Sequence, residues 1–127
     1  MMRLSHALPC LALFSVVFLS ACASQPEAQE EVYWHIVNES RQEVMVEFYS
    51  QNRDKAWPGG RSAYVIAPQS NQGHTLTCRS AELICYGAWH SNNASHYWGA
   101  GRNDENDCTN CCISCQDGSK AAITLQD

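Results

Sequence analysis

The sequence predicts an all-β domain, a small antiparallel β-sandwich or barrel of about seven short strands that is stapled by disulfides. Short runs of strand-forming residues recur between turn signals, and helical periodicity is nearly absent. Six cysteines follow in the second half of the chain, and an even number of cysteines in a small domain is typical of a disulfide framework. They are Cys78, Cys85, Cys108, Cys111, Cys112 and Cys115.

The first 21 residues have the layout of a secretory signal peptide. Arg3 supplies a positive charge, the apolar run 7–19 follows it, and small residues come next. At about 13 residues, the run is shorter than the roughly 20 residues that a helix needs to cross a bilayer.

The end of this segment, Leu19-Ser20-Ala21-Cys22, resembles the lipobox of bacterial lipoproteins, in which an aliphatic and two small residues precede the modified cysteine. The resemblance covers the N-terminal segment only. It implies cleavage before Cys22 and a diacylglycerol thioether on that residue, and Ala23, which is not Asp, favours the outer membrane. Acyl chains gain about 0.8 kcal/mol per buried CH₂, so several of them anchor a protein firmly. The alternative is an ordinary signal peptide that is cut near Ala21 or Ala23.

The mature chain is acidic and begins with a polar stretch. It keeps all 13 acidic residues and loses only Arg3 of the eight cations, which gives a net charge of −6. A chain of this charge is not expected to bind nucleic acid or a membrane surface through a basic patch. We therefore expect the lipid on Cys22 to attach it to the membrane. Residues 22–31 are predicted to form the lipidated cysteine and a flexible tether, and residues 32–127 a single β domain.

Seven segments have the composition or alternation of strands. Residues 32–37 and 43–49 flank the turn 38–42, which predicts an antiparallel hairpin; within the second segment Val44, Val46 and Phe48 share one face. The remaining strands are expected at residues 64–67, 74–78, 83–89, 96–98 and 121–125.

One disulfide has a geometric argument. Cys78 and Cys85 lie symmetrically about Ala81-Glu82, so a hairpin centred there would place them opposite each other. Opposed residues of a non-hydrogen-bonded pair bring their Cβ atoms close enough for a disulfide. We therefore expect a Cys78–Cys85 bridge.

The segment Cys108-Thr109-Asn110-Cys111-Cys112-Ile113-Ser114-Cys115 allows three interpretations. The first is structural disulfides, within the segment or to neighbouring strands. The second is a tetrathiolate zinc site, although zinc ribbons separate their two cysteine pairs by a dozen or more residues. The third is a redox Cys-x-x-Cys, but the βαβ pattern that surrounds such a motif is missing.

Other side chains are weaker candidates. Trp57, in a Pro-Gly loop, is the tryptophan most expected to be exposed, and it is a candidate for binding a glycan or a protein if it does not pack on the core. His90 and His96 are interpreted as solvated histidines near strand ends rather than a metal pair. Residues 103–107 are rich in oxygen ligands but lack the spacing of an EF-hand, which favours a solvated acidic loop.

The chain has none of the hydrolase, metalloprotease or phosphate-loop motifs. We therefore expect no enzymatic activity and no cofactor beyond the lipid on Cys22. The leading hypothesis is a membrane-anchored envelope lipoprotein that presents a rigid β domain to an unknown protein or glycan. The alternative is a metal- or thiol-handling envelope protein that uses Cys108–Cys115. A lysozyme-inhibitor-like lipoprotein fits the size, the compartment and the β content by analogy alone.

Overall fold

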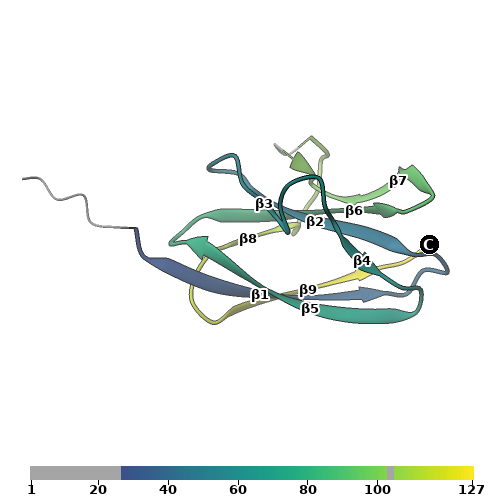
Figure 1. Ribbon diagram of the computed structural model, residues 1–127, viewed down its shortest axis with the longest axis horizontal. Coiled ribbons are helices and arrows are strands. Elements are labelled where there is room, and N and C mark those ends of the chain that lie inside the picture. The colour runs from purple at the N-terminus through teal and green to yellow at the C-terminus, as the bar shows by residue number, and fades with distance from the viewer. Residues whose placement is uncertain (1–26, 103–104) are drawn as a thin grey trace, which may run out of the picture.

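The computed structural model describes residues 27–102 and 105–127, and within them the chain forms nine β-strands and no α-helix (Figure 1). The predicted signal peptide and Cys22 lie outside the described residues. The part that the structure describes contains no helix long and apolar enough to span a membrane. The strands are β1 (Gln29–Asn38), β2 (Val44–Ser50), β3 (Ala56–Trp57), β4 (Tyr64–Ile66), β5 (Ser70–Arg79), β6 (Leu83–His90), β7 (Asn93–Gly99), β8 (Cys112–Ser114) and β9 (Ser119–Leu125).

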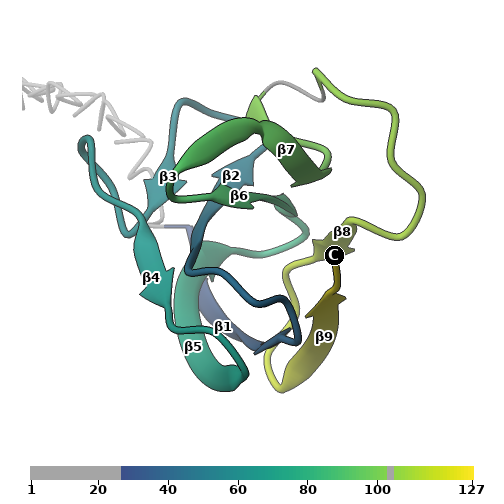
Figure 2. The same ribbon diagram turned by 90° about the vertical axis from the view of Figure 1, so that its right-hand side faces the viewer.

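The strands form two sheets that pack face to face as an open sandwich, which confirms the predicted fold class (Figure 2). The smaller sheet has the order β5-β1-β9, and the larger one has the order β3-β2-β6-β7 with β4 paired to β2 and β8 paired to β6. Pairing is antiparallel except between β1 and β9, which run parallel. The sandwich is therefore mixed rather than purely antiparallel.

Alternating side chains of both sheets build the core. In β2, Val44, Val46 and Phe48 face inward and are fully buried, as their alternation predicts. Phe48 packs on Trp34 of β1 with the ring centroids 5.0 Å apart, so the two sheets meet through aromatic contact. Burial of these large side chains supplies most of the favourable free energy of folding in a domain of this size.

Two predicted hairpins are not formed. The segments 32–37 and 43–49 are strands, but β1 belongs to the smaller sheet and β2 to the larger one. The same is true of β5 and β6, so the turn around Ala81 passes the chain between sheets. Each turn therefore connects strands of opposite layers of the sandwich. Strands in opposite layers contact each other through side chains and not through backbone hydrogen bonds.

The strand β1 begins earlier than the sequence predicts. Gln29, Glu30 and Glu31 pair with Arg79, Cys78 and Thr77 of β5, although their composition suggested a solvated tether ending at residue 31. Backbone pairing with a long neighbouring strand outweighs the weak intrinsic preference of glutamate against strands. The first strand thus starts three residues before Val32.

A buried polar side chain ties the two sheets together at the end of β1. Asn38 is fully buried, and its Nδ2 lies 3.1 Å from the carbonyl oxygens of both Ile66, the last residue of β4, and Ala67, which follows it. The same nitrogen donates to Gln42 at 2.8 Å, and Oδ1 accepts from the amide and hydroxyl of Ser40. This network fixes the predicted turn 38–42 from inside the fold.

Candidate functional site

The outer face of the larger sheet carries a row of apolar side chains. Met45 of β2 pairs with Val65 of β4 on one side and with Trp89 of β6 on the other, and Trp89 pairs with Tyr97 of β7. Their neighbours along each strand point into the core, so these four side chains point outward. Val65 is 46% exposed and the other three are partly exposed. We call these four residues the aromatic row.

A glycine allows one ring of the row to lie down on the sheet. A Cβ atom built on Gly87 would overlap the hydroxyl and ring of Tyr97, so the Tyr97 side chain fills the space above that glycine. The rings of Tyr97 and Trp89 are parallel to within 1°, with their centroids 6.0 Å apart. The row therefore includes a flat aromatic surface that rests partly on backbone.

Polar groups border this surface on the side of β2. The Tyr49 hydroxyl lies near the side chains of Glu47 and Tyr97, and the guanidinium of Arg102 lies 5.5 Å from the centre of the Tyr49 ring. Burial raises the pKa of the Glu47 carboxyl above its ordinary value, against the lowering effects of the Tyr49 hydrogen bond and of Arg102. Burial also raises the pKa of Tyr49, and the nearby Glu47 charge adds to that rise. The tyrosine hydroxyls thus remain protonated hydrogen-bond donors at neutral pH.

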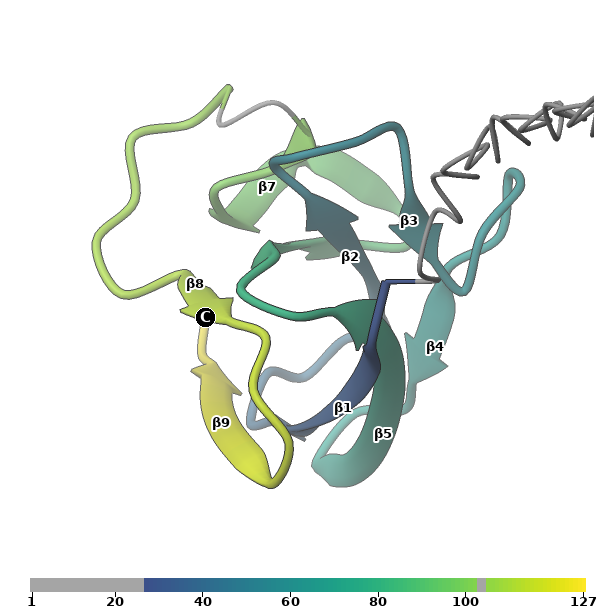
Figure 3. The same ribbon diagram turned by 90° about the vertical axis from the view of Figure 1, so that its left-hand side faces the viewer.

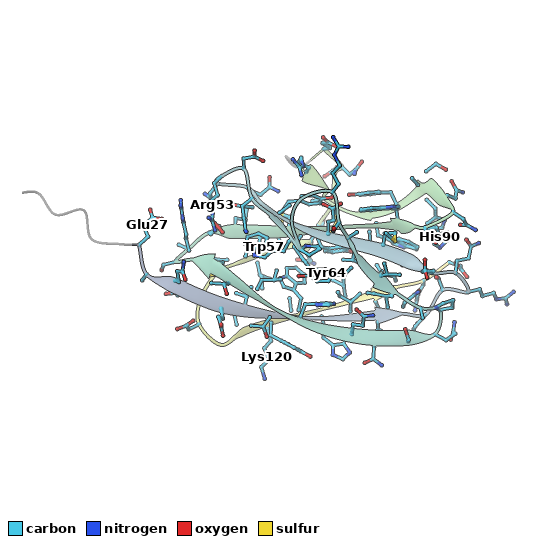
Figure 4. The ribbon with its side chains drawn as sticks, viewed as in Figure 1. Glu27, Arg53, Trp57, Tyr64, His90 and Lys120 are labelled. Carbon is cyan, nitrogen blue, oxygen red and sulfur yellow. A yellow bond between two sulfur atoms is a disulfide. The ribbon has the colours of Figure 1, made fainter. Side chains whose placement is uncertain are left out.

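A separate polar cavity of about 500 Å³ opens at the end of the sandwich where β1 begins. Figure 3 shows this end of the sandwich, and Figure 4 labels Glu27 and Arg53 there. Arg53 and Glu82 lie in its wall, and Arg53 makes two hydrogen bonds of 2.5 and 3.1 Å to the Glu82 carboxylate. Arg79 pairs with Glu27 at the same end, 2.8 Å apart. Because its cations are already paired with acids, the cavity has no unpaired charge with which to attract a ligand.

Trp57 is not exposed. Its side chain is only 7% exposed, and its Nε1 donates a hydrogen bond of 3.2 Å to the carbonyl oxygen of Thr77 in β5. Trp57 pairs with Phe48 in the larger sheet, so this hydrogen bond joins the two layers. The prediction that it is the most exposed tryptophan is wrong, and its role is core packing.

The two histidines come together but are not both solvated. His90 is 4% exposed, and its ring centroid lies 4.3 Å from that of His96 and 5.0 Å from that of Trp98. Its Nε2 is 3.5 Å from Asp127 and has no hydrogen-bond partner. The expectation of two solvated histidines fails for His90 because the residue occupies an inward position of β6. Across residues 27–102 and 105–127, His, Cys, Asp and Glu side chains form no group suited to hold a metal ion.

The six cysteines form three disulfides, but Cys78 and Cys85 are not bonded to each other. Cys78 is bonded to Cys115, and Cys85 is bonded to Cys112, its direct partner across β6 and β8. The third disulfide joins Cys108 to Cys111. The proposed Cys78–Cys85 bridge is wrong because β5 and β6 do not pair, and because Cys85, opposite Tyr49, takes an outward position of the larger sheet whereas Cys78 faces the core. The segment Cys108–Cys115 instead contributes two cysteines to neighbouring strands, so its four sulfurs do not gather around one point.

The acidic loop 103–107 lies partly outside the described residues, which include Glu105, Asn106 and Asp107. Glu105, Asn106 and Asp107 are exposed, and the amide of Asn106 donates to the carbonyl oxygen of Ala100 at 2.9 Å.

Comparisons of the chain with known protein families, with curated proteins and with solved structures find no significant match.

Sequence reasoning missed the aromatic row. The alternation of residues 43–49 placed Met45, Glu47 and Tyr49 on one face, but most aromatic residues were assigned to the core. Which aromatics meet on the outside depends on the register between β6 and β7, which contains a β-bulge between Trp89 and His90. The available signal was Gly87, two positions before Trp89 in a predicted strand, because a glycine inside a strand often marks the close approach of another group.

Proposed function

We propose that this chain is a non-catalytic lipoprotein of the bacterial cell envelope, anchored in the outer membrane through a lipid on Cys22. Its β domain presents a surface to a protein or glycan partner. The lipobox resemblance supports the anchor, and the three disulfides support an oxidising compartment.

The observation that carries the binding role is the aromatic row. Trp89 and Tyr97 lie on the outer face of the larger sheet and take no part in the core that joins the two sheets. Both large aromatic side chains remain partly exposed there. Exposed aromatic clusters bordered by polar groups are typical of interaction sites in soluble domains.

The position of the anchor supports access to this face. Six residues separate Cys22 from Gln29, where β1 begins, and a chain of that length reaches at most roughly 25 Å. The end of the sandwich that contains Arg53 and Glu27 therefore stays near the membrane (Figure 4). The strands extend away from that end (Figure 1).

Photocrosslinking in intact cells tests this function. A photoreactive amino acid at Val65, on the aromatic row, should give discrete adducts with an envelope component. The matched control carries the same group at Thr124, which is exposed on the smaller sheet. Equal adducts at both positions, or none at Val65, would contradict the proposal.

A further inference from the structure

We infer that the surface of Trp89 and Tyr97 binds the sugar rings of an uncharged glycan, with Glu47 and Arg102 reaching the sugar hydroxyls. This inference rests on the proposed binding function and names its ligand class. The first argument is the shape of the surface. The Trp89 and Tyr97 rings are stacked in parallel, and the electron-rich face of an aromatic ring attracts the weakly positive C–H groups on the flat side of a sugar ring.

The second argument is that the surface is preorganised. The Tyr97 ring is held above Gly87, where the Tyr49 ring also lies, and the parallel indole of Trp89 is its neighbour. A rigid aromatic surface loses little conformational freedom when it binds, which favours affinity for a weakly hydrophobic ligand such as a sugar.

The third argument is the chemistry of the border. A sugar hydroxyl both donates and accepts hydrogen bonds, so its site needs fixed groups of both kinds. Glu47 supplies an acceptor and Arg102 supplies donors, whereas Tyr49 is buried beneath them and supports the site from below. Glu47 and the net charge of −6 on the mature chain disfavour an anionic polymer, which leaves an uncharged glycan as the better fit.

The size of the row argues against a protein partner. A stable protein interface uses about 20–30 residues on each side. The aromatic row has one side chain from each of four strands, and only Val65 among them exceeds one-third exposure. That is enough for a few sugar rings, and a protein partner becomes the competing outcome of the test.

The experiment is calorimetric titration of the mature lipoprotein in a zwitterionic detergent, because sugar-based detergents would compete. Cellohexaose, hexa-N-acetylchitohexaose and maltohexaose serve as uncharged probes, and a hexamer of galacturonic acid serves as the anionic comparison. We expect saturable binding of at least one uncharged hexamer, with the anionic hexamer at least about tenfold weaker.

Two variants locate the site. Trp89→Ala removes one ring and should weaken binding at least about tenfold. Gly87→Ala keeps both rings, but its added Cβ takes the place of the Tyr97 hydroxyl and should weaken binding similarly. The matched control is Tyr33→Ala, since Tyr33 lies over Gly73 in the same way on the outer face of the smaller sheet. Circular dichroism of each variant confirms that the domain is folded.

The outcomes separate this inference from the function on which it rests. Binding that is lost in Trp89→Ala and Gly87→Ala but kept in Tyr33→Ala supports the inference. Absence of binding to all three uncharged hexamers, or equal binding by folded Trp89→Ala, overturns it. If the Val65 crosslink then leads to a protein, the proposed function stands with a different partner class. If the crosslink is also absent, the proposed function falls as well.

Discussion

Cys78 of β5 and Cys115, the residue that follows β8, are joined by a disulfide that covalently links the smaller sheet to the larger one. The two residues are 37 positions apart, and both side chains are buried in the core. The backbone adds a second link, because Cys115 donates to the carbonyl oxygen of Glu82 at 2.7 Å and accepts from the amide of Ala81. The turn between β5 and β6 is thus held from the C-terminal part of the chain.

Removing this disulfide should destabilise the domain strongly. A loop of this length corresponds to about 4 kcal/mol in the chain-entropy description of disulfide stabilisation. We expect the double variant Cys78→Ser/Cys115→Ser to lose about that much free energy of unfolding in urea titration. The control Cys108→Ser/Cys111→Ser opens a short loop and should lose about half as much. Equal losses in the two variants would contradict this ranking.

The cysteine pairing illustrates what the sequence could not reveal. The symmetry of Cys78 and Cys85 about Ala81-Glu82 suggested a hairpin. Ala81 has a positive φ of 63°, and the turn that contains it crosses between layers. Which cysteines meet is decided by how two sheets stack, and residues up to 37 positions apart set that arrangement. The strands themselves were predictable because burial alternates locally along each one.

The two side chains of the Arg53–Glu82 ion pair differ in burial, so removing Arg53 alone should cost more stability than removing both. Glu82 is buried with a 2% exposed side chain, whereas the Arg53 side chain is 28% exposed. Arg53→Met leaves a buried carboxylate without its partner, and we expect a loss of about 2–3 kcal/mol, below the 3–5 kcal/mol of fully buried pairs. The measurement is urea unfolding at pH 7, and the double variant Arg53→Met/Glu82→Leu should recover most of the loss.

An exposed pair at the same end provides the control. Arg79 and Glu27 have side chains that are 50% and 66% exposed, so solvent screens their attraction. Arg79→Met should change the free energy of unfolding by less than about 1 kcal/mol. A loss as large as that of Arg53→Met would show that burial of Glu82 is not the deciding factor.

His74 should make stability depend on pH. Burial lowers the pKa of His74 below its ordinary value of 6.5, so below pH 6.5 the unfolded chain takes up a proton that the folded chain resists. This contribution to stability is complete above pH 6.5 and is lost as the pH falls through the folded-state pKa. His74→Phe keeps a ring against Tyr64 and should lose less stability between about pH 7 and pH 5. An unchanged pH profile of the melting temperature would refute this role.

Asn38 should not tolerate a carboxylate. Its Nδ2 is 2.8–3.1 Å from three carbonyl oxygens, and an aspartate oxygen in that place would face them as a fourth acceptor. We expect Asn38→Asp to cost about 3 kcal/mol or more, since each unsatisfied buried polar group costs about 1–3 kcal/mol. Thermal unfolding measures it, and a variant as stable as wild type would mean that the network contributes little.

The candidate site was less predictable than the fold. Trp57 looked exposed because Pro58 and Gly59 follow it, yet its ring fills the space between β3 and β5. Trp89 was expected in the core because its strand is the most apolar. Its place in the alternation of inward and outward positions along β6 nevertheless turns it outward. Inward and outward positions follow from alternation alone, but the pairing of Trp89 with Tyr97 requires the register of two strands across a bulge.

The most direct measurement is the intact mass of the protein purified from the membrane fraction of bacterial cells. A lipid-anchored, disulfide-linked domain predicts the mass of residues 22–127 plus a diacylglycerol group on Cys22. It also predicts a mass lower by six hydrogens, for the three disulfides Cys78–Cys115, Cys85–Cys112 and Cys108–Cys111. A soluble protein without lipid mass at its N-terminus, or a chain with free thiols and bound zinc, would contradict it.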